Sequence, residues 1–266
     1  MKISVMLYSF SRALSKGEML LDHALDCCAE AGADGVEPAA SLPGNPTIDE
    51  MTALLAKYGL TVPCCDVSAD LIQDDPASRM EAVNKLAAEI KGAAALGAPV
   101  VLIVPGGLRE GIDRPLAIAR AAEGIRSLLP MAAELGVTLT VEQMGSPQAL
   151  CTRGEHMRAV VEAVGSPAFG LTYDPGNFYL TGEDCVKPLP GLLPWVRHVH
   201  FKDIKLRPDG WTSVPLGTGE VPLDAVYRIL ADGGYDGYIS VEYEGAEEPC
   251  AAVQAGIGYV QGLMGR

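Results

Sequence analysis

The sequence predicts an α/β protein, a single (β/α)8 TIM barrel that spans residues 1–266 as one domain. Short apolar runs alternate with helical stretches from one end to the other, as in parallel sheets joined by crossover helices. The composition, 48% hydrophobic and 20% charged, supplies enough apolar material for a large core. No linker, charge block or low-complexity stretch interrupts the alternation, which favours one domain.

The predicted strands carry apolar residues at consecutive positions, which is typical of strands buried on both faces. In chain order they are expected at Ile3–Leu7, Gly35–Glu37, Val62–Asp66, Val100–Val104, Thr138–Glu142, Gly170–Tyr173, His198–Phe201 and Tyr238–Glu242. Eight such units favour a closed barrel. An open doubly wound sheet is the alternative, but the sequence lacks the nucleotide-binding glycine fingerprint that usually marks it.

The segments between these strands contain helix signals. Capping boxes, in which a hydroxyl and a carboxylate three residues apart satisfy free amides, are expected at 15–18, 47–50 and 152–155. Glycines that favour a left-handed C-cap follow the helical stretches at Gly32, Gly59, Gly97 and Gly136. These signals predict helices between successive strands.

The charge and hydropathy exclude several classes of protein. A formal net charge of −14 argues against a nucleic-acid partner, because phosphate backbones are bound by basic patches. The apolar runs are far shorter than the roughly 20 residues that cross a bilayer. The first residues lack the apolar stretch and cleavage site of a secretory signal. The seven scattered cysteines form no metal or redox motif and are expected to be reduced and mostly buried. We therefore expect a cytoplasmic protein that binds neither nucleic acid nor membranes.

The predicted site lies where the late strands end, since catalytic residues of βα barrels gather at the C-terminal ends of the strands. Four consecutive strands end in Glu142, Asp174, His200 and Glu242. Alone, each acid would more often cap a helix or form a surface ion pair. Together, three carboxylates around one imidazole would repel one another unless a cation neutralised them. The sequence predicts one divalent metal ion at these residues, with Mn²⁺ preferred and Mg²⁺, Co²⁺ or Zn²⁺ as alternatives.

The motifs around these residues resemble those of the xylose-isomerase-like TIM-barrel superfamily, in particular its sugar phosphate isomerases and epimerases. They are Val141-Glu142-Gln143, Tyr173-Asp174-Pro175-Gly176-Asn177, the stretch 198–203, the stretch 215–221 and Ser240-Val241-Glu242-Tyr243. The resemblance covers the whole chain. It implies that Glu142, Asp174, His200 and Glu242 are the metal ligands, and that Glu142 and Glu242 are also the catalytic pair that exchanges protons with the substrate.

This chemistry suits a sugar-like substrate. Removal of a proton beside a carbonyl leaves an enediolate, whose negative charge a metal ion stabilises. Two carboxylates can take the proton from one face and return it to the other face or to the next carbon. The predicted function is a divalent-metal-dependent isomerase or epimerase of a sugar, sugar phosphate or keto-sugar. The alternative is a lyase or dehydratase of a keto-sugar or related polyol ketone, which shares the first proton abstraction.

Some residues depart from the ketohexose 3-epimerases of the superfamily. Asn177, Gln148 and Leu206 stand where those enzymes usually have His, Glu and Arg, and Arg207 is one residue out of register. These differences leave the substrate open. The DNA-repair endonucleases of the superfamily need several histidines at their metal site, whereas this acidic chain has four in total. A non-catalytic binding module would not require the complete ligand set.

Weaker candidates for substrate binding are Glu37, Asn177, Lys202, Tyr8, Asp66 and Trp211. Glu37 is expected either to bind a substrate hydroxyl or to take a helix-capping or surface role. Lys202 is expected either to neutralise a substrate oxyanion or phosphate or to form an ion pair with Asp203 or another acid. Trp211, on a long loop after the seventh strand, is expected to cover the sugar or contact a second subunit. Gly106-Gly107 and Gly217-Thr218-Gly219 are candidate anion-binding turns. His198 is interpreted as a packing residue that faces away from the partners of His200. The resemblance leaves homo-oligomer formation open.

Overall fold

The computed structural model describes residues 1–39, 46–208 and 210–266. Its main sheet has parallel strands in the order β2-β1-β10-β7-β6-β5-β4-β3. The strands are β1 (Lys2–Met6), β2 (Gly35–Glu37), β3 (Cys64–Ser68), β4 (Val100–Val104), β5 (Thr138–Glu142), β6 (Phe169–Tyr173), β7 (Val196–Phe201) and β10 (Tyr238–Val241). All eight predicted strands are confirmed, and their ends lie within two residues of the predicted ones.

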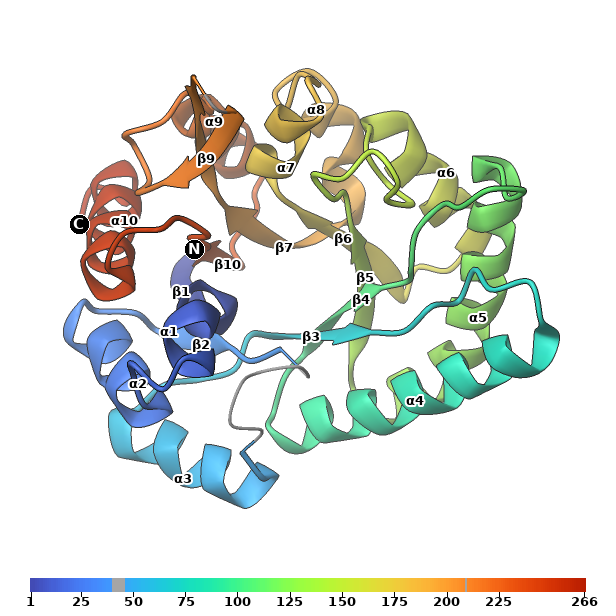
Figure 1. Cartoon of the computed structure of the whole chain (residues 1–266), viewed down its shortest axis with the longest axis horizontal. Coiled ribbons are helices and arrows are strands. Elements are labelled where there is room, and N and C mark those ends of the chain that lie inside the picture. Colours follow the sequence, from blue (N-terminus) through green and yellow to red (C-terminus); the bar gives the residue numbers. More distant parts are fainter. Residues whose placement is uncertain (40–45, 209) are drawn as a thin grey trace.

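The sheet curls into a nearly closed barrel (Figure 1). Its two outermost strands, β2 and β3, are joined by isolated bridges between Gly35 and Thr61 and between Ala39 and Asp66. Every other neighbouring pair shares a register of three to five residues. The predicted single TIM barrel is therefore confirmed, with one weakly joined seam.

Helices surround this barrel on the outside (Figure 1). The longer ones are α2 (Leu21–Glu30), α3 (Ile48–Tyr58), α4 (Pro76–Ala95), α5 (Arg114–Glu134), α6 (Gly154–Val164), α9 (Leu223–Asp232) and α10 (Pro249–Met264). The shorter ones are α1 (Ser11–Ser15), α7 (Pro175–Leu180) and α8 (Leu189–Leu192), with 3₁₀ turns at Leu7–Phe10 and Leu193–Trp195. No helix in the described parts of the chain is both long enough and apolar enough to cross a bilayer.

The structure confirms some of the predicted helix caps and contradicts others. The capping box of Thr47 and Glu50 starts α3 as predicted, and the four expected C-cap glycines all have positive φ. The other two capping boxes are wrong. Ser15 ends α1 rather than starting a helix. The Thr152 hydroxyl lies 3.2 Å from His156 Nδ1, and α6 begins after Arg153 without a side-chain cap.

The apolar core fills the space between the sheet and the helices. Leu25, Ile90, Ile125 and Val160 from four helices are fully buried there. Six of the seven cysteines are also buried, as predicted. The interior of the barrel is polar instead, because inward-facing strand residues include the hydrogen-bonded pair Thr140 and Thr172 (2.8 Å). Polar side chains thus lead from the centre of the barrel to its mouth.

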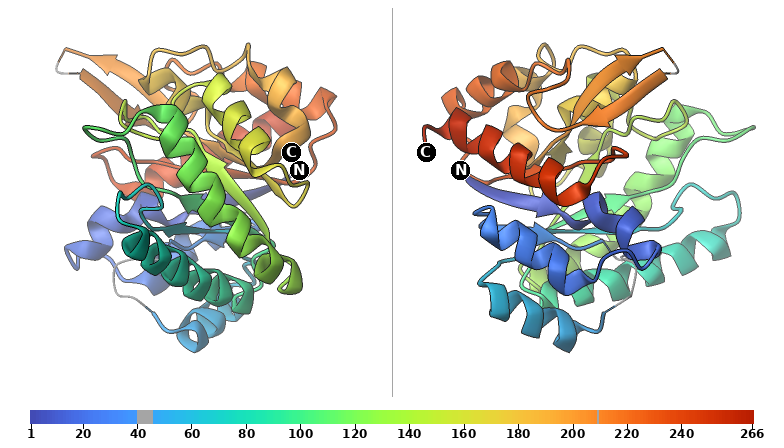
Figure 2. Two further views of the ribbon diagram at one scale, coloured as in Figure 1. Left: turned by 90° about the vertical axis from the view of Figure 1, so that its right-hand side faces the viewer. Right: turned by 60° about the vertical axis from the view of Figure 1, so that its left-hand side comes forward.

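The sequence did not predict the hairpin that follows β7. The segment after β7 forms an antiparallel hairpin of β8 (Asp203–Arg207) and β9 (Gly210–Val214), where the sequence suggested a long loop. The hairpin projects from the barrel beside α7 (Figure 2). Alternation of apolar and basic residues from Ile204 to Arg207 was the signal for an exposed strand.

Asp203 anchors the chain that returns from this hairpin. Its buried carboxylate accepts hydrogen bonds from the backbone N–H groups of Gly217 (2.9 Å), Gly219 (2.8 Å) and Val221 (3.1 Å). Hydrogen bonds to an ionised acceptor are stronger than neutral ones. The side chain of Asp203 therefore holds this turn in place.

We expect Asp203→Ala to lower the free energy of unfolding by about 2–4 kcal/mol, because it leaves these three amides and that of Ile204 without their acceptor. Urea unfolding measures this change. Asp232→Ala, the same substitution at an exposed position, should stay within about 0.5 kcal/mol of the parent. Equal stabilities of the two variants would contradict the anchoring role.

Candidate functional site

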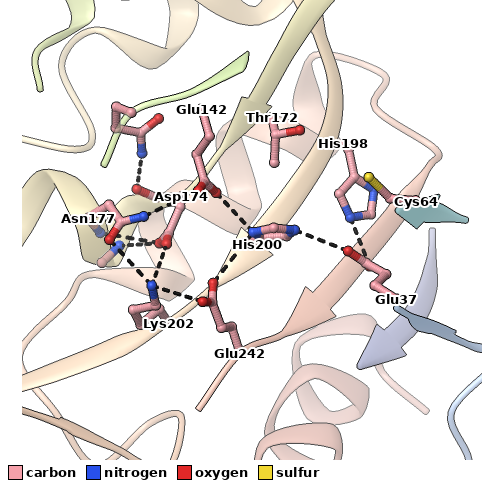
Figure 3. A network of polar contacts seen from close by, with 12 residues as sticks. Glu37, Cys64, Glu142, Thr172, Asp174, Asn177, His198, His200, Lys202 and Glu242 are labelled. Carbon is pink, nitrogen blue, oxygen red and sulfur yellow. Dashed lines mark hydrogen bonds and ion pairs between the residues drawn. The ribbon is translucent and has the colours of Figure 1, made fainter. Parts of the chain in front are cut away.

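The predicted acids and histidine meet at the C-terminal mouth of the barrel. Glu142 is the last residue of β5, Asp174 follows β6, His200 lies in β7 and Glu242 follows β10. These four strands are successive neighbours in the sheet. Their side chains therefore converge on one place, although they are up to 100 residues apart in sequence (Figure 3).

Each of the four side chains has one buried atom without a hydrogen-bond partner among the described residues: Glu142 Oε1, Asp174 Oδ2, His200 Nδ1 and Glu242 Oε2. His200 Nδ1 lies 2.9 Å from Glu142 Oε1 and 3.4 Å from Glu242 Oε2, without hydrogen-bond alignment. Buried polar atoms without partners cost free energy. Three oxygens and one nitrogen in this state form a donor set that fits a divalent cation.

The convergence is tightest for three of the four. Ligand atoms of Glu142, His200 and Glu242 lie within 4.8 Å of one another. Burial lowers the pKa of His200, but the surrounding carboxylates of Glu142, Glu242 and Glu37 outweigh that effect and raise it well above its ordinary value. The cluster thus attracts positive charge.

Asp174 combines two roles that the sequence left as alternatives. Its Oδ1 caps α7 by accepting hydrogen bonds from the backbone N–H groups of Gly176 (2.7 Å) and Asn177 (3.3 Å). Its Oδ2 faces the cluster, 3.3 Å from Lys202 Nζ. Burial raises the pKa of Asp174 to about 8, and the nearby ammonium group only partly opposes this. The helix cap therefore orients the carboxylate toward the site.

Lys202 lies buried among carboxylates. Its Nζ is 3.0 Å from Glu242 Oε1 and 2.6 Å from Glu244 Oε1, in addition to Asp174. Its ammonium group also donates to Asn177 Oδ1 (3.3 Å). Of the two roles that the sequence left open for Lys202, the structure shows the ion pair with acids of the protein itself.

Glu37 lies below the cavity rather than facing a substrate. It is fully buried, with Oε1 2.9 Å from His198 Nε2 and Oε2 3.1 Å from His200 Nε2, and Oε1 also accepts from Ser4 Oγ. Burial alone would raise the pKa of Glu37, but the two imidazoles outweigh it and lower that pKa. The expected contact with a substrate hydroxyl is corrected, because both oxygens are occupied.

His198 also requires a correction. It was interpreted as a packing residue facing away from the partners of His200, yet both rings bind the same carboxylate. Residues two apart in a strand point to the same face, so His198 and His200 both face the barrel interior.

A cavity of about 460 Å³ opens above the cluster, and Glu142, His200 and Glu242 line it. Four of the weaker candidates line it as well: Tyr8, Asp66, Asn177 and Lys202. Trp211 does not belong to the described lining. It lies on the exposed hairpin, where its ring is edge-on to the ring of Tyr179 from α7, with the ring centroids 5.2 Å apart.

Sequence reasoning missed several lining residues, including Glu244, Met6, Met144 and Ser146. The sequence did contain a signal for Glu244. Residues two apart in an extended segment point to the same face, so Glu244 is expected on the same side as Glu242, just as Lys202 is on the same side as His200. The methionines and Ser146 carry no such signal, since their position depends on how the loops fold over the mouth.

Several known proteins are similar to this chain in sequence. A family model described as a xylose isomerase-like TIM barrel matches residues 25–262. An inosose isomerase from Halalkalibacterium halodurans is 25% identical over 244 residues, which cover 88% of this chain and 86% of that protein. An L-ribulose-5-phosphate 3-epimerase from Salmonella typhi is 26% identical over 228 residues, covering 81% and 77%. An inosose dehydratase from Clostridium perfringens is 27% identical over 148 residues, so the match spans 48% of that enzyme's length.

Solved structures agree with the fold. The IOLI protein with a bound zinc atom superposes with a TM-score of 0.84 at 19% identity, over 99% of this chain and 98% of that one. A D-allulose 3-epimerase from Methylomonas sp. in complex with D-allulose gives a TM-score of 0.83 at 18% identity, over 98% and 96%. At this identity both structures confirm the barrel itself.

Proposed function

Because the chain belongs to the xylose isomerase-like TIM barrel family, we propose that it is a divalent-metal-dependent isomerase or epimerase of a sugar or keto-sugar. Its relatives are isomerases, epimerases and dehydratases, and the chain is an enzyme. The observation that carries the proposal is the set of four buried atoms without partners on Glu142, Asp174, His200 and Glu242.

These four residues would hold the ion, and the bound ion would supply positive charge that stabilises a developing oxyanion. The oxygen-rich donor set with one imidazole favours Mn²⁺, and Mg²⁺, Co²⁺ and Zn²⁺ are the alternatives that metal analysis of the purified protein distinguishes. No thiolate belongs to the set, which favours an exchangeable ion.

The two glutamates are suited to move a proton. In each, one oxygen faces His200 Nδ1 without hydrogen-bond alignment and the other is held: Asn177 Nδ2 lies 3.4 Å from Glu142 Oε2, and Lys202 Nζ lies 3.0 Å from Glu242 Oε1. Lys202 and His200 also keep the pKa of Glu242 low despite its burial, so it is ionised. One carboxylate takes the proton beside the substrate carbonyl. The other returns it on the opposite face in an epimerisation, or to the next carbon in an isomerisation.

A lyase is the second candidate, and the inosose dehydratase among the relatives favours it. The same carboxylate would remove the first proton, and a β-hydroxyl would then leave as water. NMR of the product separates the two, since a dehydratase loses one molecule of water and an isomerase keeps the composition of its substrate.

The test is a screen by NMR with Mn²⁺, Co²⁺ or Mg²⁺ added to the purified protein. It covers ketoses, ketose phosphates, inosose-type ketones and 3-keto-glycosides. Conversion of at least one compound to an isomer or epimer is expected. No turnover of any compound with any of these ions would refute the proposed activity.

Glu37 is expected to position His200 for the ion. An ionised carboxylate can only accept, so the Nε2 of His200 carries the hydrogen. With the ion bound, Nδ1 would carry no proton and its lone pair would face the cluster. Outer carboxylates of this kind contribute about 10–100-fold to metal affinity. We therefore expect Glu37→Gln to weaken Mn²⁺ binding by about that factor, measured by calorimetry.

Glu30→Gln, the same change at an exposed position of α2, should leave the Mn²⁺ affinity unchanged. Nitrogen chemical shifts of His200 report its tautomer directly, and they should change in Glu37→Gln only. A folded Glu37→Gln protein with the parent's affinity and tautomer would contradict this role.

A further inference from the structure

We infer that the substrate of this cavity is an uncharged polyol ketone, either an open-chain ketose or a cyclic polyol ketone, and not a phosphate ester. The inference rests on the proposed function and assigns its substrate class. It follows from the charges that line the cavity and from the contacts of the two glycine turns that were candidates for binding an anion.

The cavity wall is acidic. Carboxyl groups of Asp66, Glu142, Glu242 and Glu244 line it, and Lys202 carries the only permanent positive charge among the lining residues that the structure describes. That ammonium group already contacts the carboxylates of Glu242, Glu244 and Asp174. A phosphate dianion would meet repelling oxygens and would have to compete with three acids for one cation.

Two further bases, on elements that border the cavity, are also paired. Arg109 Nη2 lies 2.7 Å from Asp70 Oδ2, and Lys85 Nζ lies 3.2 Å from Glu89 Oε1. The sequence of residues 40–45 contains neither lysine nor arginine. A phosphate would therefore gain no unpaired side-chain cation from Arg109, Lys85 or residues 40–45.

A carboxylate of the protein itself lies against each of the two candidate anion-binding turns. The N–H groups of Gly217 and Gly219 donate to Asp203 Oδ2, at 2.9 and 2.8 Å. The carboxylate of Asp70 packs against Gly106, where a phosphate would have to approach. Backbone amides attract anions only when their N–H groups are free, so the turn at Gly217 and Gly219 stabilises its own loop instead.

The same wall suits hydroxyl groups. Asp66 Oδ1 is buried without a hydrogen-bond partner among the described residues, and Glu244 is partly exposed at the rim. Carboxyl oxygens accept hydrogen bonds from hydroxyls. Met6, Met144 and the half-exposed ring of Tyr8 supply apolar surface for the C–H face of a polyol. This mixture of acceptors and apolar patches is that of a site for a neutral sugar.

The test compares matched pairs on the Mn²⁺-loaded protein by calorimetry: a ketopentose, a ketohexose and an inosose, each with its phosphate monoester. In at least one pair we expect the neutral compound to bind at least tenfold more tightly than its phosphate. Tighter or equal binding of the phosphates, or no binding of any neutral compound, would overturn the inference.

Hydrogen exchange in D₂O on the same pairs separates this inference from the proposed function. Neutral ketones that bind without exchange would refute the proton-transfer activity and leave the substrate class standing. Faster exchange of a phosphate ester than of its neutral partner would refute the substrate class and leave the activity standing.

A variant tests the cause. Glu244→Gln removes one carboxylate from Lys202, so discrimination against the phosphates should fall by at least fivefold. Glu247→Gln makes the same charge change on the same loop at an exposed position outside the lining, and it should leave discrimination unchanged. Equal effects of the two variants would attribute discrimination to the net charge of the protein and contradict the local argument.

Discussion

Replacement of Glu142 or Glu242 by Gln is expected to lower kcat by about 10²–10⁴-fold, which corresponds to roughly 3–5 kcal/mol of barrier. Gln keeps an oxygen for the ion but cannot accept the proton, so Mn²⁺ affinity should fall much less than the rate. Turnover in D₂O measures the effect directly. The parent should place deuterium on the carbon beside the carbonyl, and the variants should do so at the reduced rate.

Glu247→Gln again serves as the control, since it changes the same functional group outside the cavity. The opposite result is a product that retains its original hydrogen, together with near-normal rates in both Gln variants. That outcome would indicate a hydride shift and would remove the two glutamates from the proton-transfer role.

Removal of the metal should abolish turnover completely. Without the ion, Glu142, Asp174 and Glu242 repel one another and nothing stabilises the charge that forms on the substrate oxygen. We expect dialysis against a chelator to stop the reaction, and Mn²⁺ or Co²⁺ to restore it, with the metal content followed by elemental analysis. The ion should also stabilise the fold, by about 2.7 kcal/mol when its concentration is 100 times Kd.

Cys250→Ala provides a control for nonspecific metal effects. This thiol is only partly buried and belongs to none of the candidate metal-binding groups among the described residues. Its chelator response should equal that of the parent. Full turnover by a protein shown to be free of metal would refute the metal-dependent mechanism.

The sequence predicted the barrel well, because strands buried on both faces leave a strong local pattern. β4 and β5 match their predicted ends, and the errors at β3 and β7 are two residues. The convergence of Glu142, Asp174, His200 and Glu242 was also predictable, because parallel strands end on one side of a barrel. The hairpin after β7 was missed, since its exposed residues pack against little of the core.

The sequence could not predict what surrounds these residues. Glu37 meets His198 and His200 across 161 and 163 residues of chain, and only the closed barrel brings them together. Lys202 was recognised as a possible anion binder, but its partner Glu244 lies on another strand's loop. Local patterns show which residues end a strand, while the assignment of partners requires the register of distant strands.

The seam between β2 and β3 has a consequence for how molecules reach the cavity. Only isolated bridges join the strands at this seam, whereas β5 and β6 share a continuous ladder. We therefore expect the backbone of Val36 and Asp66 to fluctuate more readily than the backbone of β5 and β6. Asp66 is also part of the cavity wall. We therefore expect the more mobile side of the barrel to border the cavity, and the side that carries Glu142, Asp174 and His200 to be the more rigid one.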